Sequence, residues 1–255
     1  MAGPAPVRAT GLLGWIRIVV RLAAMLGWLA LCTPLYFAWH LGGSDNPWPR
    51  RFLAGIARIS GVSLRTTGQR PSSGEFLLAN HVSWIDIPAI AATTGAAFVG
   101  HDGLASVPFI RWLCTANRTV FVARHDRTSV QRQVEQVRAA VLGSGALAIF
   151  PEGTTSDGTG LLAFKSSLLS ALDPVPPGVA VQPVLLDYGR EAANIAWVGE
   201  EHGLDNFLRI LARSRNVELA VHFLEPLTGE ALASRKTMAA AARQAVLAAL
   251  EARPD

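Results

Sequence analysis

Between residues 62 and 223, the chain alternates short apolar segments with segments of helical periodicity. Seven segments predict strands, at 62–68, 75–79, 97–100, 119–123, 146–150, 180–186 and 217–223. Four others predict helices, at 87–92, 106–113, 129–142 and 234–252. The 146–150 segment is apolar throughout, which predicts a central strand. This alternation favours a mixed α/β sheet flanked by helices.

Polar residues follow three of the predicted strands. His81 and Asp86 come after the 75–79 segment, Arg124 after 119–123, and the Glu152–Ser156 turn after 146–150. Binding and catalytic sites in α/β sheets gather at the carboxyl ends of the strands. We therefore expect these three clusters to meet in one site.

His81 and Asp86 are five residues apart, a spacing that puts them on different faces of a continuous helix. They can meet only if His81 lies in a loop and Asp86 in the first turns of the next helix. Asp86 would then hold one ring nitrogen, leaving the other free to act as a base. Ser83 is placed to cap that helix. The alternative is a purely structural His/Asp pair.

The turn at Glu152, Gly153, Thr154 and Thr155 has features of a ligand-binding loop. Glycine allows close approach to the backbone, and hydroxyl and N–H groups bond to polar oxygens. Arg124 could pair a phosphate bidentately. An ordinary turn and a solvated arginine are the alternatives for these two features.

Residues 1–60 differ in character from the rest of the chain. They carry six arginines against one acid, Asp45, whereas the remainder carries 17 basic and 18 acidic residues. Leu22–Trp39 runs for 18 residues without a charge, near the lower limit for a spanning helix. Pro34 is expected to break or kink that helix. Such a segment favours a membrane surface with anionic lipids over a nucleic-acid partner.

We divide the chain into a membrane-anchoring region, 1–60, and a catalytic domain, 61–255. The anchor is expected to be a helical hairpin, or one span followed by a helix at 46–59 that lies on the bilayer. A very apolar helix in a soluble core is the alternative. Two cysteines give no disulfide framework, and arginines flank the apolar run, so we expect the cytoplasmic face of the inner or plasma membrane.

Several familiar catalytic motifs are absent from the sequence. It contains no Gly-x-Ser-x-Gly elbow, Walker loop, dinucleotide-binding glycine fingerprint, His-Glu-x-x-His or paired Cys-x-x-Cys. Their absence argues against a common serine hydrolase, a nucleotide enzyme and a zinc enzyme. No metal or redox cofactor is expected.

Four blocks in order resemble the glycerolipid acyltransferase family, whose typical member is 1-acylglycerol-3-phosphate acyltransferase. They are Asn80-His81-x-Ser83-x-x-Asp86, Phe121-Val122-x-Arg124, Phe150 to Ser156, and Val181-x-Pro183-Val184. The resemblance implies a membrane-attached fold like that of glycerol-3-phosphate acyltransferase, with His81 and Asp86 as the catalytic dyad. It also implies an acyl-CoA or acyl carrier protein donor and a lysophospholipid acceptor. The residues expected to bind substrate are Ser83, His101, Arg124, Glu152, Gly153, Thr154 and Thr155.

One position departs from the family pattern. Phosphate-binding members carry a lysine and then a glutamate after the third strand, where this chain has His101 and Gly103. A largely neutral imidazole is a poorer phosphate anchor than an ammonium group. The expected acceptor is 1-acylglycerol-3-phosphate, giving phosphatidic acid, and the leading alternative is a lyso-ornithine lipid.

We expect His81 to take the acceptor's hydroxyl proton as that oxygen attacks the thioester carbonyl, while Asp86 stabilises the imidazolium. Two rival hypotheses remain. One is a lipid hydrolase that uses Ser83 as nucleophile and His81 as base. The other is a non-catalytic lipid-binding protein, which would tolerate the loss of His81.

Overall fold

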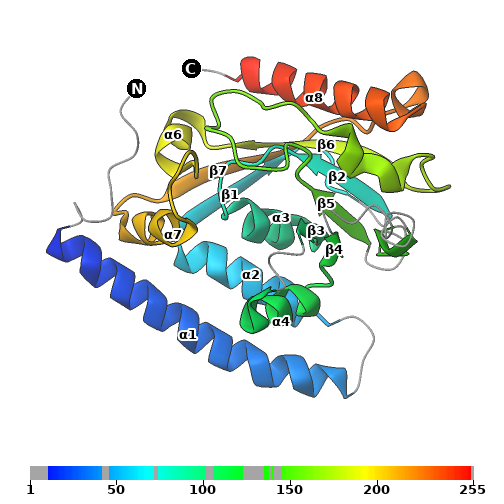
Figure 1. Ribbon diagram of the computed structural model, residues 1–255. Coiled ribbons are helices and arrows are strands. Elements are labelled where there is room, and N and C mark those ends of the chain that lie inside the picture. Colours follow the sequence, from blue (N-terminus) through cyan, green and yellow to red (C-terminus); the bar gives the residue numbers. More distant parts are fainter. Residues whose placement is uncertain are drawn as a thin grey trace.

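The protein, described by a computed structural model, has a seven-stranded sheet with helices on both faces (Figure 1). The structure describes residues 11–41, 46–71, 74–101, 106–122, 135–137, 139–140 and 145–253. The strands lie in the order β1-β7-β6-β2-β5-β3-β4. Neighbouring strands are parallel except for β6 and β7, which makes the sheet mixed, as predicted.

All seven predicted strands are present, with ends that differ by at most two residues. They are β1 (Val62–Thr67), β2 (Glu75–Ala79), β3 (Ala97–His101), β4 (Val120–Val122), β5 (Ala146–Ile149), β6 (Ala180–Asp187) and β7 (Val217–Phe223). The α-helices are α1 (Leu12–His40), α2 (Trp48–Ile59), α3 (Asp86–Thr94), α4 (Pro108–Ala116), α6 (Ala192–Ile195), α7 (Gly203–Ala212) and α8 (Arg235–Glu251). In the described part of the chain, 3-10 helices are η4 (Ser166–Leu172), η5 (Gly189–Glu191) and η6 (Gly229–Leu232).

Strand β2 lies in the middle of the sheet and is buried on both faces. Leu77 and Ala79 face the core that also contains residues of α2 and α3. Phe76 and Leu78 face the core that contains α8 and η4. Figure 1 shows α8 above the sheet and α3, α2 and α1 successively below it. A strand covered on both faces is apolar wherever it is fully buried, which explains the unbroken apolar run from Phe76 to Ala79 after the partly buried Glu75.

Helix α1 contacts the rest of the protein along a single stripe. Its buried residues are Gly14, Ile18, Met25 and Cys32, and Arg21 and Trp28 between them are half-buried. The spacing alternates between four and three residues, which keeps one face of a helix against its neighbours. The rest of the helix is mostly exposed, so α1 is not a helix of a soluble core.

The stripe is attached at three places along the length of α1. Arg21 donates to the Leu211 carbonyl at the end of α7, at 2.9 Å. The Trp28 indole donates to the Phe52 carbonyl of α2 at 3.2 Å. Near the end of α1, the ring of Phe37 stacks with Trp112 of α4, their centroids 6.5 Å apart. Helix α1 therefore lies along the body of the protein rather than projecting from it.

Helix α2 lies between α1 and α3. Leu53 packs against the core under the sheet, while Ile56 and Ile59 pack beside α1 and α7. Gly55 allows this approach, because a Cβ there would meet the Trp28 ring within 2.0 Å. Protein therefore covers much of the face that the sequence pattern assigned to a bilayer.

Two features of the helices differ from the sequence predictions. Pro34 was expected to break or kink the helix; it does not break α1, which continues to His40. A proline removes only one backbone hydrogen bond, and packing of the last turns against α4 favours continuation. Helix α7 was not predicted at all. The predicted 129–142 helix lies mostly outside the described residues; 135–137 and 139–140 are helical.

Candidate active site

His81 and Asp86 are in direct contact at the carboxyl end of β2. His81 lies in the loop after the strand, and Asp86 is the first residue of α3. The distance from His81 Nδ1 to Asp86 Oδ2 is 2.7 Å. The Asp86 side chain is fully buried, whereas 18% of the His81 side chain is exposed. This is the arrangement that the spacing predicted.

The Asp86 carboxylate accepts four hydrogen bonds. Besides His81, Oδ2 accepts from the backbone N–H groups of Val82, at 2.6 Å, and Ser83, at 2.9 Å. Oδ1 accepts from the hydroxyl of Tyr188, which follows β6. Burial, reinforced by the negative charge of Asp86, raises the pKa of Tyr188 well above its ordinary value. The tyrosine is therefore a neutral O–H donor.

The backbone of His81 is held on both sides by the Glu152–Ser156 turn. Its N–H donates to Glu152 Oε1 at 2.8 Å, and its carbonyl accepts from the Ser156 N–H at 2.7 Å. The Ser156 hydroxyl donates to the same carbonyl at 3.1 Å. Two loops far apart in sequence are thereby joined at the histidine.

Glu152 is a buried connector. Its second oxygen, Oε2, accepts from the Leu162 N–H at 2.9 Å, and 1% of the residue is exposed. Burial raises the pKa of Glu152, although hydrogen bonds from the His81 and Leu162 N–H groups oppose that effect. Its carboxylate thus joins the loops around His81.

Asn80 continues the pairing of β2 with β6 beyond the end of the strand. Its amide nitrogen donates to the Leu186 carbonyl at 3.1 Å, and the Leu186 N–H donates to its oxygen at 2.7 Å. A side chain that imitates a backbone peptide in this way ties the start of the His81 loop to the end of β6. Tyr188 follows Leu186 by two residues.

Ser83 does not cap α3, contrary to the sequence prediction. The residue before the helix is Ile85, and no side chain caps it. The Ser83 hydroxyl is buried and donates to Asn206 Oδ1 of α7 at 3.4 Å. The Asp86 carboxylate instead accepts the N–H groups of the loop, because it points back over its own helix start.

A cavity of about 680 Å³ lies beside His81. Its lining includes the polar residues Thr154, Thr155 and Glu201 together with Gly153, and many apolar residues such as Leu53, Phe98 and Leu113. Ser83, Asp86 and Glu152 are not among its lining residues. The histidine ring therefore meets the cavity, while the groups that hold it lie behind.

The segment from Trp197 to Glu201 also lines the cavity, and the sequence reasoning missed it. The Trp197 N–H donates to the Val82 carbonyl at 2.9 Å, and its carbonyl accepts from the Thr155 hydroxyl. Glu201 pairs with Arg209 of α7, with 2.8 Å between Oε1 and Nε. The sequence signal that could have indicated this segment is the run after β6 in which Trp197 and Glu201 flank Gly199.

Two predicted site residues are not placed. Arg124 lies outside the described residues, and His101 is described only by its backbone, as the last residue of β3. Gly100, its neighbour, lines the cavity. The structure thus brings together the first and third predicted clusters and leaves the second as a prediction.

Comparison with known proteins identifies the family of the chain. A family model described as Acyltransferase matches residues 62–187. A lyso-ornithine lipid O-acyltransferase of Pseudomonas aeruginosa is 34% identical over 250 residues, covering 92% of this chain and 94% of that protein. The chain belongs to the acyltransferase family. It is thus an enzyme that acylates lysolipids.

This acyltransferase has further relatives of different name. A 1-acyl-sn-glycerol-3-phosphate acyltransferase of Neisseria gonorrhoeae is 30% identical over 157 residues, covering 60% of each chain. The crystal structure of the 1-acyl-sn-glycerophosphate acyltransferase PlsC from Thermotoga maritima aligns with a TM-score of 0.61 and 19% identity. That alignment covers 94% of this acyltransferase and 99% of PlsC, and confirms the fold.

Proposed function

We propose that the protein transfers a fatty acyl group from an acyl thioester to the hydroxyl group of a lyso-ornithine lipid, with His81 and Asp86 as its catalytic dyad. The observation that carries this proposal is the position of His81. One ring nitrogen is held by a buried carboxylate, while the ring lines a largely apolar cavity large enough for lipid.

The reaction needs one base and no cofactor. With Nδ1 hydrogen-bonded to Asp86, His81 presents Nε2 to the acceptor hydroxyl. Nε2 takes the proton as the oxygen attacks the thioester carbonyl, and Asp86 stabilises the resulting imidazolium. The C–S bond then breaks, and the imidazolium returns the proton to the leaving thiolate. The products are the acylated lipid and the free thiol of coenzyme A or acyl carrier protein.

The attack leaves a negative charge on the former carbonyl oxygen of the thioester, and this oxyanion needs hydrogen-bond donors. The backbone N–H groups of residues 81–83 are not available for it. The N–H of His81 is bonded to Glu152, and those of Val82 and Ser83 to Asp86. The Gly153–Thr155 turn lines the cavity next to these occupied donors. Within this turn the Gly153 N–H is bonded to the Phe150 carbonyl and the Thr155 hydroxyl to the Trp197 carbonyl. We therefore assign the oxyanion site to the backbone N–H groups of Thr154 and Thr155 and the Thr154 hydroxyl.

Two observations support a lyso-ornithine lipid as acceptor. The Pseudomonas enzyme of that name aligns over 94% of its length, whereas the Neisseria glycerophosphate enzyme aligns over 60%. The described lining of the cavity includes one acid, Glu201, and no lysine or arginine. A terminal phosphate would favour cationic partners, which this described lining lacks, and Glu201 is already paired with Arg209.

Hydrolysis with Ser83 as the nucleophile has no geometric support. The Ser83 hydroxyl is buried against α7, outside the cavity lining. A nucleophile must reach the carbonyl carbon of the substrate, and His81 turns its bonded nitrogen toward Asp86. Direct transfer is therefore the mechanism that we propose.

The apolar face of α1 is proposed as the membrane attachment. Helix α1 is long and apolar enough to cross a bilayer, with a mean hydropathy of 1.9. It nonetheless packs along the body through α7, α2 and α4. Crossing the bilayer would carry this polar body into the hydrocarbon region, at high cost. We propose that α1 lies in the plane of the membrane surface, within a membrane-attaching region at 1–60.

The cavity lies close to that attachment. A smaller apolar pocket of about 80 Å³ between α1, α2 and α4 shares Leu53, Leu113 and Asn117 with it. A lipid acceptor would thus have a short path from the bilayer to the dyad. Donors on coenzyme A or acyl carrier protein require the cytoplasmic face, which the two free cysteines and the flanking arginines also favour.

A transfer assay with radiolabelled acyl-CoA tests the dyad. His81→Ala and Asp86→Asn should each lower the rate by roughly 10²–10⁴, because they remove the base or its partner. His222→Ala is the matched control, since that imidazole bonds to Thr67 and does not line the cavity. Near-normal turnover by folded His81→Ala protein would contradict the proposal.

Acceptor and donor are tested separately in the same assay. Lyso-ornithine lipid, 1-acylglycerol-3-phosphate and lysophosphatidylcholine are offered with acyl-CoA and then with acyl carrier protein. We expect the highest kcat/KM with lyso-ornithine lipid. A preference for 1-acylglycerol-3-phosphate would instead assign phosphatidic acid synthesis. Release of free fatty acid without transfer would assign a hydrolase.

A further inference from the structure

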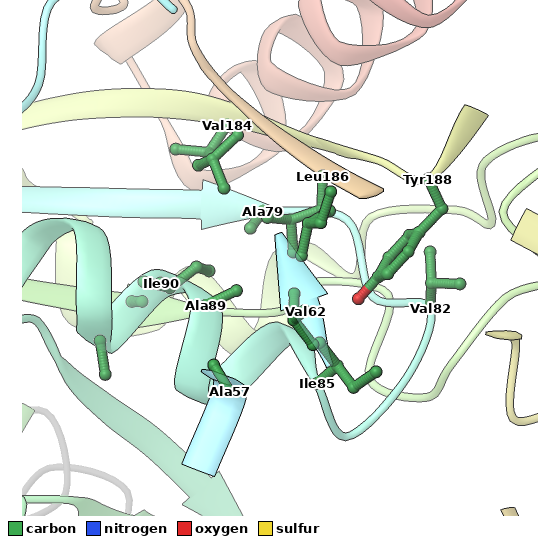
Figure 2. Close-up of a cluster of buried hydrophobic side chains, with 14 of the residues drawn as sticks. Ala57, Val62, Ala79, Val82, Ile85, Ala89, Ile90, Val184, Leu186 and Tyr188 are labelled. Carbon is green, nitrogen blue, oxygen red and sulfur yellow. The ribbon is translucent and has the colours of Figure 1, made fainter. Parts of the chain in front are cut away.

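Tyr188 is bonded to the proposed catalytic aspartate from the side opposite the histidine. Its hydroxyl donates to Asp86 Oδ1, whereas His81 bonds to Oδ2. The residue is 3% exposed and is not part of the cavity lining. Figure 2 shows its ring among buried apolar side chains, with the hydroxyl directed toward the loop that carries Val82 and Ile85. It therefore touches the acid of the dyad and no substrate.

The position of Tyr188 is fixed by the sheet. Strands β2 and β6 are neighbours and parallel, so their carboxyl ends lie at the same edge. Asn80 bonds to Leu186 in both directions, which ties the loop after β2 to the end of β6. Two residues later the chain reaches Tyr188. The hydroxyl is thus held at Asp86 by the same strand pair that holds His81.

The hydrogen bonds of Asp86 are unevenly divided between its two oxygens. Among the described residues, Oδ2 accepts three, from His81, Val82 and Ser83, and Oδ1 accepts one, from Tyr188. Both oxygens are fully buried, where an oxygen without a donor is costly. Tyr188 is consequently the group that stabilises the charge on the far oxygen and fixes the rotation of the carboxylate.

We propose that Tyr188 is a positioning residue for acyl transfer, which holds the Asp86 carboxylate in the orientation and charge state that His81 requires. This inference rests on the proposed dyad. Without the hydroxyl, Oδ1 loses its donor, and the rotation of the carboxylate is restrained only through the bonds to Oδ2. Its charge also concentrates on the oxygen that faces the imidazole. The tyrosine itself transfers no proton, because its O–H bond stays intact throughout the reaction.

The consequence for pH dependence has a definite sign. A hydrogen-bond donor to a buried carboxylate favours the charged form of that group, and Tyr188→Phe removes one such donor from Oδ1. The active arrangement of the dyad is therefore lost at a higher pH in the variant than in the wild type. Glu152, the other acidic group that contacts His81, bonds to its backbone N–H and is unchanged by the substitution. The acidic limb of the kcat/KM profile therefore moves upward.

Tyr188→Phe is the test, since phenylalanine retains the ring that packs in the core. We expect kcat to fall about ten-fold, as for loss of one hydrogen bond to a charged group, with little change in KM. The acidic limb should move to higher pH. The matched control is Tyr36→Phe, which removes the hydroxyl of the only other tyrosine in the chain, at the end of α1. It should leave the profile unchanged.

A double-mutant cycle separates positioning from general stabilisation. If Tyr188 acts through Asp86, adding Tyr188→Phe to Asp86→Asn should not lower kcat further. Thermal unfolding of each variant in detergent reports loss of stability independently. The inference is overturned if Tyr188→Phe lowers only the unfolding temperature, with a normal pH profile, or if its effect on kcat persists in the Asp86→Asn background. If His81→Ala is active, the dyad itself has failed.

Discussion

The ring of His81 stacks on the ring of Phe150, with 4.1 Å between their centroids and 15° between their planes. Phe150 follows β5, the strand next to β2, and its peptide carbonyl accepts from the Gly153 N–H at 3.0 Å. The imidazole is thus held from three directions: by Asp86 at its edge, by the Glu152–Ser156 turn at its backbone, and by Phe150 at its face. These contacts leave the imidazole ring little freedom to rotate.

Phe150→Leu should weaken catalysis without removing it. The substitution keeps apolar volume but loses a stacking contact worth about 0.5–1.5 kcal/mol, which corresponds to roughly a 2- to 10-fold lower kcat. Steady-state kinetics at fixed pH measure the effect. Phe223→Leu, in the core on β7, is the matched control. Equal losses in both variants would assign the effect to general packing.

Ser83→Ala should leave acyl transfer within about three-fold of the wild-type rate. The hydroxyl contributes one hydrogen bond to Asn206, and its loss should lower the free energy of unfolding by about 0.5–1.5 kcal/mol. Urea denaturation and the transfer assay are run on the same preparation. If Ser83→Ala lost as much activity as His81→Ala, the hypothesis that Ser83 is the nucleophile would have to be considered again.

Glu152 should give the protein a pH-dependent stability. Burial raises its pKa, so the folded state disfavours the carboxylate relative to the unfolded chain. Its contribution to the free energy of unfolding is full below the ordinary glutamate range and is lost as pH rises through the raised pKa. Urea titrations of wild type and Glu152→Gln across this range measure the difference. If the pKa of Glu152 is raised, the free energy of unfolding should depend less steeply on pH in Glu152→Gln than in the wild type. Equal slopes of the free energy of unfolding against pH would contradict this prediction.

Glu152→Gln should also lower activity. An amide has one accepting oxygen where the carboxylate has two, so either the His81 or the Leu162 N–H loses its partner. The cost of a buried unsatisfied N–H is about 1–3 kcal/mol. Transfer rates at neutral pH test this, and normal kinetics would show that the connector is dispensable.

Charges on the outer face of α1 should release the protein from membranes. Val19 and Leu26 are 63% and 67% exposed, whereas Ile18 is 2% exposed. Val19→Glu/Leu26→Glu should therefore remove vesicle binding with unfolding in detergent unchanged, while Ile18→Glu should destabilise the fold. Salt alone should not release the wild-type protein, because screening does not weaken apolar burial. If the double variant still co-sediments with vesicles, the protein is attached to the membrane through another surface.

Substitutions on the outer face of α1 are a more specific test of membrane attachment than deletion of residues 1–60. Removal of α1 and α2 would uncover Leu211 of α7 and the core residues that pack against Leu53. Release after such a deletion could reflect unfolding as well as loss of attachment. Surface substitutions keep the packed stripe intact and therefore report on lipid contact alone.

His101→Lys tests the acceptor. If the enzyme prefers 1-acylglycerol-3-phosphate, a lysine at this position should improve its apparent affinity by at most about 1.5–3 kcal/mol, the scale of a charged hydrogen bond. With lyso-ornithine lipid, the same change should do little or impair binding. Transfer rates are measured for each of the two lysolipids with the wild-type enzyme and with His101→Lys. A strong wild-type preference for the phosphate with no gain from lysine would show that residue 101 does not face the headgroup.

The strands and the dyad were predictable because their signals are local. A strand covered on both faces must be apolar, so the 75–79 and 146–150 segments identified β2 and β5 directly. The five-residue spacing of His81 and Asp86 left a loop followed by a helix start as the productive geometry, and the structure has it. Residue order alone was sufficient for these features.

Other features depend on contacts between distant segments. Tyr188 lies 102 residues from Asp86, and Asn206 lies 123 residues from Ser83, so no spacing rule connects either pair. The sequence therefore assigned Ser83 to a helix cap, a local role, while the fold gave it a partner on α7. The apolar run of α1 likewise indicated a membrane helix, but only its packed stripe showed that it lies along the body. Local patterns determine which elements form and where polar groups stand on them; the tertiary structure decides which of those groups meet, because that depends on the strand order.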